Sequence, residues 1–222
     1  MNVEFLGRVS YRRAVQIQAE ALSARVDGLI ADTVFLLEHD PVVTLGRALD
    51  ARLTDSQRLA LGDRGVEIVD SDRGGQATFH GPGQLVAYPI LSLRTRANDA
   101  HSYLRSLEAL IIEWLASYGV AAGVEPGLTG VWAGHRKIAS IGVSIRRGVT
   151  CHGFAVNLDP DLSVFQLFDP CGIDGSRITS IYRETGKVPS LARVADSIAP
   201  YFDEFLSVSN SDRLPECVPA HV

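Results

Sequence analysis

Three segments of the chain carry residue types that can do covalent or acid–base chemistry. In the first, Cys171 lies between Pro170 and Gly172, which place the thiol on a tight turn. A cysteine attacks a carbonyl carbon only as the thiolate, and with a reference pKa of about 8.5 it needs help near neutral pH. The turn therefore favours a nucleophile, whereas a small buried side chain is the commoner role of a free cysteine.

The second segment contains Lys137 at the start of an expected strand, 136–146. If this segment is extended, Lys137, Ile141 and Val143 point to the same side. An ammonium group on an apolar face needs an anion, and a thiolate would serve. The alternative is a lysine at a strand end whose ammonium reaches water along its own stem.

The third segment, 73–84, contains four glycines, one proline and His80 directly before the apolar run 85–90. Glycine permits a close approach of the backbone to a ligand, so the segment predicts a wall of a binding site. His80 and the later His152 are candidates for an acid, a base or a hydrogen-bond donor, although neutral histidines bonded to the backbone are equally common. Cys151 precedes His152, and because neighbours on a strand point to opposite faces the two make a poor dyad.

Bulk composition excludes several classes of protein. The chain has 222 residues, of which 46% are hydrophobic and 21% charged, with a net charge of −5. This mix is typical of a soluble globular protein and argues against general nucleic-acid binding, which needs clustered positive charge. The sequence has no apolar run of membrane-spanning length, no CxxC pair, no phosphate-binding loop and no metal-like histidine spacing. We therefore expect a cytoplasmic protein with reduced cysteines and no metal.

The elements that must position these residues mix helices with strands. The strands are expected at 3–8, 33–38, 42–45, 66–69, 85–91, 120–123, 130–133, 136–146 and 150–157. The helices are expected at 11–26, 55–61, 100–118 and 191–206, the last with a break or kink at Pro200. Several strands look hairpin-linked, with a turn at 146–149. The pattern predicts an α+β fold with a mixed, largely antiparallel sheet flanked by helices, as a single domain over 1–207 with a loose tail at 208–222.

Together these segments resemble the lipoyl(octanoyl) transferase family. The motifs that carry the resemblance are 39–47, 73–84, 137–142, 152–157 and 170–172. The resemblance covers roughly residues 38 to 181, and the order and spacing of its motifs make it specific. It implies the fold of the biotin and lipoate protein ligase superfamily, in agreement with the α+β prediction.

The resemblance implies transfer of an octanoyl group from acyl carrier protein to a lysine of a lipoyl domain. The acceptors would be 2-oxoacid dehydrogenase E2 subunits and the glycine cleavage H protein, and the enzyme would be a monomer without a cofactor. By motif match, Cys171 is the acyl-accepting nucleophile and Lys137 is its partner. The residues implied to line the acyl pocket are Arg73, Gly74, Gly75, Gln76, Ala77, Thr78, Phe79, His80, Ser140, Ile141, Gly142, Gly153, Phe154 and Ala155.

Two features depart from a simple match, and three other functions stay open. Phe79 stands where the family usually has tyrosine, so one hydroxyl is lost. The partner proteins are usually acidic, as is this chain, so docking needs local positive patches, for which Arg146-Arg147 or Arg94 and Arg96 are candidates.

The alternatives are an ATP-dependent lipoate–protein ligase on the same fold, a thioesterase-like hydrolase and a non-catalytic acyl-binding module. A ligase would need no cysteine nucleophile.

Overall fold

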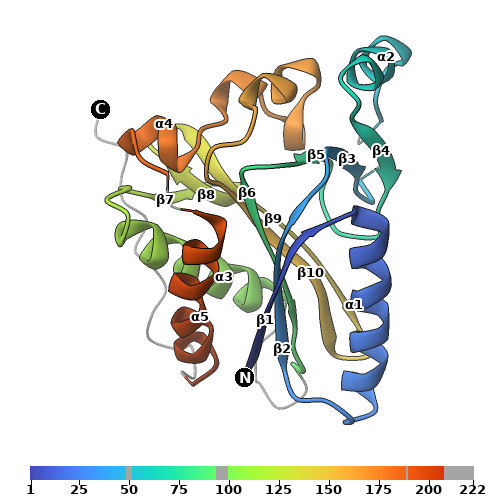
Figure 1. Ribbon diagram of the computed structural model, residues 1–222, viewed down its shortest axis with the longest axis vertical. Helices are drawn as coiled ribbons and strands as arrows, with labels where there is room; N and C mark the ends of the chain where they lie inside the picture. The colour runs from blue at the N-terminus through green and yellow to red at the C-terminus, as the bar shows by residue number, and fades with distance from the viewer. Residues whose placement is uncertain (49–51, 94–99, 189, 208–222) are drawn as a thin grey trace.

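The computed structural model describes residues 1–48, 52–93, 100–188 and 190–207, which form two β-sheets and the helices around them (Figure 1). The expected tail at 208–222 and the candidate docking residues Arg94 and Arg96 lie outside the described residues.

The larger sheet has seven strands in the order β1-β2-β6-β10-β9-β8-β7. In chain order these strands are β1 (Asn2–Val9), β2 (Thr33–His39), β6 (Gln84–Ile90), β7 (Gly123–Glu125), β8 (Leu128–Ala133), β9 (Arg136–Arg146) and β10 (Val149–Asn157). Among the strands of this sheet that the structure describes, only β1 and β2 run parallel, and the remaining neighbours are antiparallel. The sheet is therefore mixed and largely antiparallel, which confirms the predicted fold class.

A smaller sheet carries the glycine-rich segment. Its strands are β3 (Val42–Leu45), β4 (Glu67–Asp70) and β5 (Ala77–His80), in the order β4-β3-β5. β3 runs parallel to β4 and antiparallel to β5. The smaller sheet lies beside the N-terminal end of α1, at one end of the larger sheet (Figure 1). Residues 77–80, expected as part of a loop, are thus a strand that leads directly into β6.

Helices cover both faces of the larger sheet. α1 (Tyr11–Val26) packs on one face, and α3 (Ala100–Ala116) with α5 (Leu191–Ser207) packs on the other (Figure 1). The Ser10 hydroxyl accepts a hydrogen bond from the backbone N–H of Arg13 and so caps α1 as expected. α5 is one continuous helix through Pro200, so of the break or kink predicted there the break does not occur.

The remaining elements are short and lie between β3 and β4 or between β10 and α5 in the chain. They are α2 (Asp55–Asp63), α4 (Ile181–Thr185) and the 3-10 turns η1 (Leu162–Leu167), η2 (Pro170–Gly172) and η3 (Gly175–Arg177). The short elements between 162 and 185 were not expected, because they are too brief to leave a periodic pattern. The η2 turn holds Cys171.

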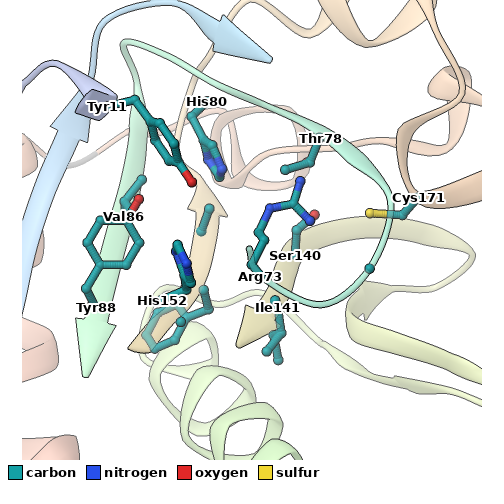
Figure 2. A pocket seen from close by; sticks show the side chains of 15 residues that line it. Tyr11, Arg73, Thr78, His80, Val86, Tyr88, Ser140, Ile141, His152 and Cys171 are labelled. Carbon is teal, nitrogen blue, oxygen red and sulfur yellow. The ribbon is translucent and has the colours of Figure 1, made fainter. Parts of the chain in front are cut away.

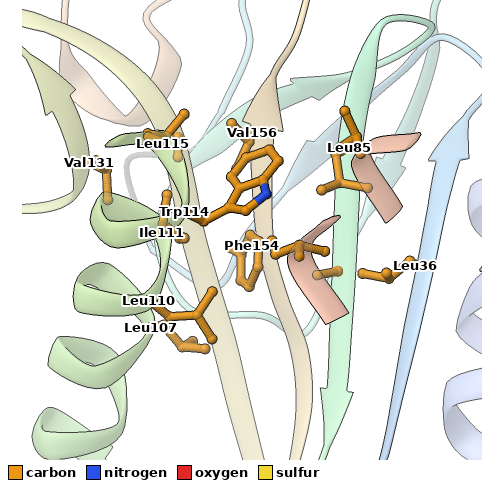
Figure 3. Packing of buried hydrophobic residues seen from close by; sticks show 14 of the residues in the cluster. Leu36, Leu85, Leu107, Leu110, Ile111, Trp114, Leu115, Val131, Phe154 and Val156 are labelled. Atoms are coloured by element: carbon orange, nitrogen blue, oxygen red, sulfur yellow. The ribbon is translucent and has the colours of Figure 1, made fainter. Parts of the chain in front are cut away.

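The strands show the alternation that lets one sheet serve two environments. On β6, Leu85 and Ala87 pack into the cluster beneath α3 and α5, whereas Val86, Tyr88 and Ile90 pack toward α1. Figure 3 shows Trp114 of α3 pointing at Phe154 and Val156 of β10. The core is therefore split by the sheet into two layers.

One expected strand is displaced, and one expected turn is confirmed. Residues 120–122 are not part of a strand; instead the N–H of Val120 donates to the carbonyl of Leu115 at 3.2 Å, and Gly119 has φ +77°, so Gly119 and Val120 close α3. The strand β7 begins only at Gly123. The turn between β9 and β10 has positive φ at Arg147 (50°) and Gly148 (77°), as a two-residue hairpin requires.

Candidate active site

A pocket opens where the smaller sheet meets the α1 face of the larger one (Figure 2). It is lined from α1, β5, β6, β9, β10, the loop before β5 and η2. The lining residues are Tyr11, Arg73, Gly75, Thr78, His80, Val86, Tyr88, Ser140, Ile141, Gly142, His152, Gly153, Phe154, Ala155 and Cys171. Segments that lie far apart in the sequence therefore meet around one cavity.

Most of the residues implied by the family resemblance line this pocket, but four do not. Gly74, Gln76, Ala77 and Phe79 are absent from the described lining. The reason for two of them is alternation along β5, because Thr78 and His80 face the pocket while Ala77 and Phe79 pack into a hydrophobic cluster. Phe79 contacts the ring of Phe165 edge-on at 5.5 Å between centroids. The ring of Phe79 therefore lies in the core, and the hydroxyl that a tyrosine would carry at this position would not face the pocket.

Cys171 stands at the pocket in a strained backbone conformation. Its φ of 54° and ψ of 34° lie in the left-handed region, which costs a residue with a Cβ about 1–3 kcal/mol. Gly172 follows with φ +70°, and a Cβ there would come within 2.7 Å of Gln76 Oε1. The Cys171 thiol lies 3.7 Å from the carbonyl oxygen of Ala77. The proline and glycine beside the cysteine thus hold its sulfur toward the cavity (Figure 2).

Lys137 is largely buried on β9, and the whole residue is 5% exposed. Its Nζ lies 5.5 Å from the ring centroid of Trp132. A Cβ at Gly130 would come within 2.6 Å of Lys137 Cε, so the glycine makes room for the lysine stem. Among the described residues, no hydrogen bond joins Lys137 to Cys171, and Lys137 does not line the pocket. Their partnership stays a prediction.

Buried phenol and imidazole rings, those of Tyr11, His80, Tyr88 and His152, line one side of the pocket, and His39 lies behind Tyr88. His39 donates from Nδ1 to the carbonyl of Val9 at 2.7 Å, so its Nε2 accepts from the Tyr88 hydroxyl, also at 2.7 Å. His80 Nδ1 lies 2.7 Å from Gln84 Oε1. Burial lowers the pKa of His39 to about 4 and that of His80 to about 3. Both rings are therefore neutral near pH 7.

His152 interrupts the regular geometry of β10. Its φ is +58°, and its Nε2–H donates to Asp72 Oδ1 at 2.7 Å. Burial lowers the pKa of His152, while the hydrogen bond to Asp72 acts in the opposite direction. Asp72 also pairs with Arg146, so this candidate docking arginine already has a partner. Cys151, the residue before, points away to Gln18, and burial raises the pKa of its thiol to about 11.

The close approach of β10 to β6 is set by Gly153. A Cβ at this position would lie 2.2 Å from the carbonyl oxygen of Ala87 and 2.6 Å from Pro89 Cδ. Position 153 therefore accepts no side chain.

Sequence reasoning missed four residues near the pocket: Tyr11, Asp72, Val86 and Tyr88. Tyr11 is the first residue of α1, and Val86 and Tyr88 belong to a continuous apolar run, so neither pattern marks them as lining residues.

The described residues contain no helix long and apolar enough to cross a membrane. They also contain no cluster of three or more His, Cys, Asp or Glu side chains that could hold a metal ion.

Solved structures share this fold. A putative lipoate protein ligase from T. acidophilum matches with a TM-score of 0.69 at 18% identity, over 93% of this chain and 85% of that chain. A lipoate-protein ligase A bound with ATP matches with a TM-score of 0.71 at 17% identity, over 93% of this chain and 86% of that chain. The biotin protein ligase of Aquifex aeolicus matches with a TM-score of 0.58 at 15% identity, over 93% of this chain and 70% of that chain. These likenesses show that the chain has the fold of the lipoate and biotin protein ligases.

Sequence comparisons narrow this class to a family. The family described as lipoyl protein ligase A/B catalytic domain matches residues 10–203. The octanoyltransferase of Chloroflexus aurantiacus is 44% identical over 94% of this chain and 95% of its own length. Octanoyltransferases of Geobacter metallireducens (42% identical; 97% of this chain, 96% of the relative) and Rubrobacter xylanophilus (46%; 90% of each) match similarly. The chain belongs to the lipoyl protein ligase A/B catalytic domain family and, within it, to the octanoyltransferases.

Proposed function

We propose that the chain moves an octanoyl group from octanoyl–acyl carrier protein to a specific lysine of a lipoyl domain through a thioester on Cys171. The observation that supports this most directly is the sulfur of Cys171 on a strained turn, pointing into a partly apolar pocket (Figure 2). A thioester exchanged for another thioester is nearly balanced in energy, so this route needs no ATP.

In the first step, the thiolate of Cys171 attacks the carbonyl carbon of the donor thioester. A new C–S bond forms, the carbon–sulfur bond to the carrier breaks, and the carrier leaves as a thiolate that takes up a proton. The charge that develops on the carbonyl oxygen needs a donor, and the backbone N–H groups of Gly172 and Gly75 are candidates. One well-placed donor of this kind is worth about 3–4 kcal/mol in known enzymes.

In the second step, the neutral amine of the acceptor lysine attacks the acyl carbon. The amide C–N bond forms, the bond to Cys171 breaks, and the sulfur leaves as a thiolate. The amine must lose one proton, and we assign its uptake to Lys137 in the neutral form. The burial of Lys137 against Trp132 supports a functional role for this lysine, because burying an ammonium group without an anion is unfavourable.

The acyl chain has apolar walls to occupy. Val86 and Ala155, cross-strand neighbours on β6 and β10, present apolar side chains on the pocket face. Ile141 and Phe154 also line the pocket from their strands, although their side chains pack into the cluster beneath α3 and α5. Each buried CH₂ group contributes about 0.8 kcal/mol. Exclusion of water from the same space would protect the thioester from hydrolysis.

The partners and setting follow the same proposal. The acceptors are lipoyl domains of 2-oxoacid dehydrogenase E2 subunits and the glycine cleavage H protein, and the enzyme acts as a cytoplasmic monomer without a cofactor. Cys171 and Lys137 are the catalytic residues of this proposal. The pocket residues that line the cavity bind the acyl group.

Intact mass spectrometry tests this reaction. The protein is mixed with octanoyl–acyl carrier protein and quenched rapidly. The wild type is expected to gain one octanoyl group, and Cys171→Ala is expected to gain none. Cys151→Ala is the matched control, because that thiol is buried and bonded to Gln18, and it should acylate as the wild type does.

A second stage separates a transferase from a ligase. The acyl-enzyme is mixed with a lipoyl domain without ATP, and octanoylation of the domain is expected. Activity of Cys171→Ser with free octanoate and ATP, or no adduct on wild type under rapid quench, would overturn the proposal. Lys137→Met is expected to retain the first step and slow the second.

A further inference from the structure

Arg73 places a guanidinium in the wall of the pocket. The side chain is buried, at 6% exposure, and lines the same cavity as Cys171. Figure 2 shows the sulfur of Cys171 pointing into the pocket toward the side that the Arg73 guanidinium occupies. Two glycines make room for it, because a Cβ at Gly46 would come within 2.9 Å of Nη1 and one at Gly142 within 3.1 Å of Cδ. The guanidinium is thus a built feature of the site.

Neutral oxygens hold Arg73 in place. Nε and Nη2 donate to Thr44 Oγ1 at 3.1 and 2.8 Å, Nη2 donates to the Thr44 carbonyl at 2.7 Å, and Nη1 donates to the Gly74 carbonyl at 3.0 Å. A guanidinium has five N–H donors, and these contacts use the single donor on Nε, both donors on Nη2 and one on Nη1. The second N–H on Nη1 is left for a group in the pocket.

The charge of Arg73 is not balanced by a carboxylate. In the part of the chain that the structure describes, no Asp or Glu oxygen lies within 4.0 Å of its guanidinium. The adjacent carboxylate, Asp72, is turned away to His152 and Arg146. A buried cation without an anion is unfavourable, so the site has a place for a negative charge.

Arg73 is also the permanent charge of the described lining. The other titratable groups that face Cys171 across the pocket are Tyr11, His80, Tyr88 and His152. Burial lowers the pKa of both histidines and raises the pKa of both tyrosines, so all four are neutral near pH 7. Burial also lowers the pKa of Arg73, whereas a Cys171 thiolate acts to raise it, and arginine stays protonated in proteins.

We infer that Arg73 is the cation that stabilises the Cys171 thiolate, with Lys137 free for proton transfer in the second step. This assignment rests on the proposed role of Cys171 as nucleophile and divides the chemistry between two cations. A guanidinium cannot take the proton from the acceptor amine, whereas a lysine can.

Alkylation of Cys171 by iodoacetamide tests this inference without an acyl donor. The rate is followed between pH 5 and 9 by mass spectrometry of the peptide that contains Cys171, which separates it from the other thiols. An opposite charge within about 4–6 Å typically lowers the pKa of an acidic group by about 1–3 units. In Arg73→Gln we therefore expect the midpoint of the profile to move up by about one unit and the rate at pH 7 to fall about tenfold.

Two variants distinguish the charge of Arg73 from its structural bonds. Arg73→Lys keeps the positive charge but loses the paired hydrogen bonds from the guanidinium to Thr44, and it is expected to retain most of the alkylation rate. Thr44→Val removes the hydroxyl that accepts from Arg73 but keeps the guanidinium, and it should also retain most of the alkylation rate. Equal losses in Arg73→Lys and Arg73→Gln would overturn the inference.

Lys137→Met tests which cation stabilises the Cys171 thiolate even if Arg73→Gln does not fold. We expect Cys171 in this variant to react at pH 7 well above the rate of a Pro-Cys-Gly peptide. A fall to the rate of the peptide would assign thiolate stabilisation to Lys137 and overturn the inference. Because acylation of Cys171 is measured separately, failure of the proposed transferase reaction would remain distinguishable.

Discussion

The two faces of the larger sheet are made by the same strands and differ sharply in chemistry. Beneath α3 and α5, the sheet presents side chains such as Leu85, Phe154 and Val156 to an apolar cluster (Figure 3). On the other face, near the smaller sheet, it presents Tyr88 and His152 to the pocket. Neighbouring positions of one strand therefore contribute to stability on one side and to the site on the other.

The contrast between the two faces shows how a small domain can contain a buried polar site. Burying imidazoles and phenols without charge is tolerable only when each finds a hydrogen-bond partner. His39, His80 and His152 each have one, in Tyr88 and Val9, in Gln84 and in Asp72. The apolar face supplies the stability against which these polar groups are held. Three perturbations separate the two faces, in order of expected size.

The largest effect is expected from Trp114→Ala on the apolar face. Trp114 is fully buried and also donates from Nε1 to Ser197 Oγ at 3.0 Å, so the variant loses packing and a link between α3 and α5. The free energy of unfolding should fall by about 3–5 kcal/mol, as measured by urea denaturation. Leu59→Ala, at a residue 70% exposed on α2, is the control and should change little. Alkylation of Cys171 in the folded fraction should stay unchanged, and a changed rate would show that the two faces are coupled.

Lowering the pH is expected to reduce the free energy of unfolding by a smaller amount, and this loss arises from the buried histidines near the pocket. The pKa of His39 is about 4 and that of His80 about 3 in the folded protein, against an ordinary value of about 6.5 when unfolded. Below pH 6.5 the unfolded chain binds more protons, so stability falls as the pH falls toward 4. Between pH 7 and pH 5.5 we expect a loss of about 1 kcal/mol for each histidine.

Urea denaturation at several pH values measures this slope. His39→Gln should make it shallower, and His101→Gln, at an exposed position, should leave it as it is. An unchanged slope in His39→Gln would mean that the buried ring is not the source.

The smallest effect is expected from Tyr88→Phe. The variant removes the hydroxyl that donates to His39 Nε2 and leaves that nitrogen buried without its partner. The expected loss is about 1 kcal/mol of unfolding free energy. Tyr182→Phe, at a residue 50% exposed, is the matched control. A loss as large as that of Trp114→Ala would show that the polar wall, too, is a main source of stability.

Much of the fold could be predicted because its signals are local. The helical spacing within 11–26 and the Arg147-Gly148 turn depend on residues close in sequence, and the structure has both. The strand expected at 120–123 is displaced, because the local hydrogen bond that ends α3 after Gly119 uses Val120 and β7 begins only at Gly123. The strand β5 was hidden by the glycines around it.

The candidate site was only partly accessible from the sequence. The motifs at 73–84 and 170–172 indicated which segments meet, since glycine and proline reveal turns and close approaches. The ion pair of Asp72 with Arg146 and its hydrogen bond from His152 join positions at least 74 residues apart, so no local pattern contains them. The burial of Arg73 without a carboxylate depends on the fold as a whole.

Gly153 and Pro89 have a practical consequence for redesign of the cavity. Because any Cβ at position 153 would collide with the β6 backbone and with the proline ring, this stretch of the wall is fixed by main-chain atoms. Engineering for longer or bulkier acyl groups therefore has to change a side chain on the pocket face, such as Val86 on the neighbouring strand β6, rather than position 153. The same collision makes position 153 a sensitive indicator in library selections, where any survivor other than glycine would report a displaced β10.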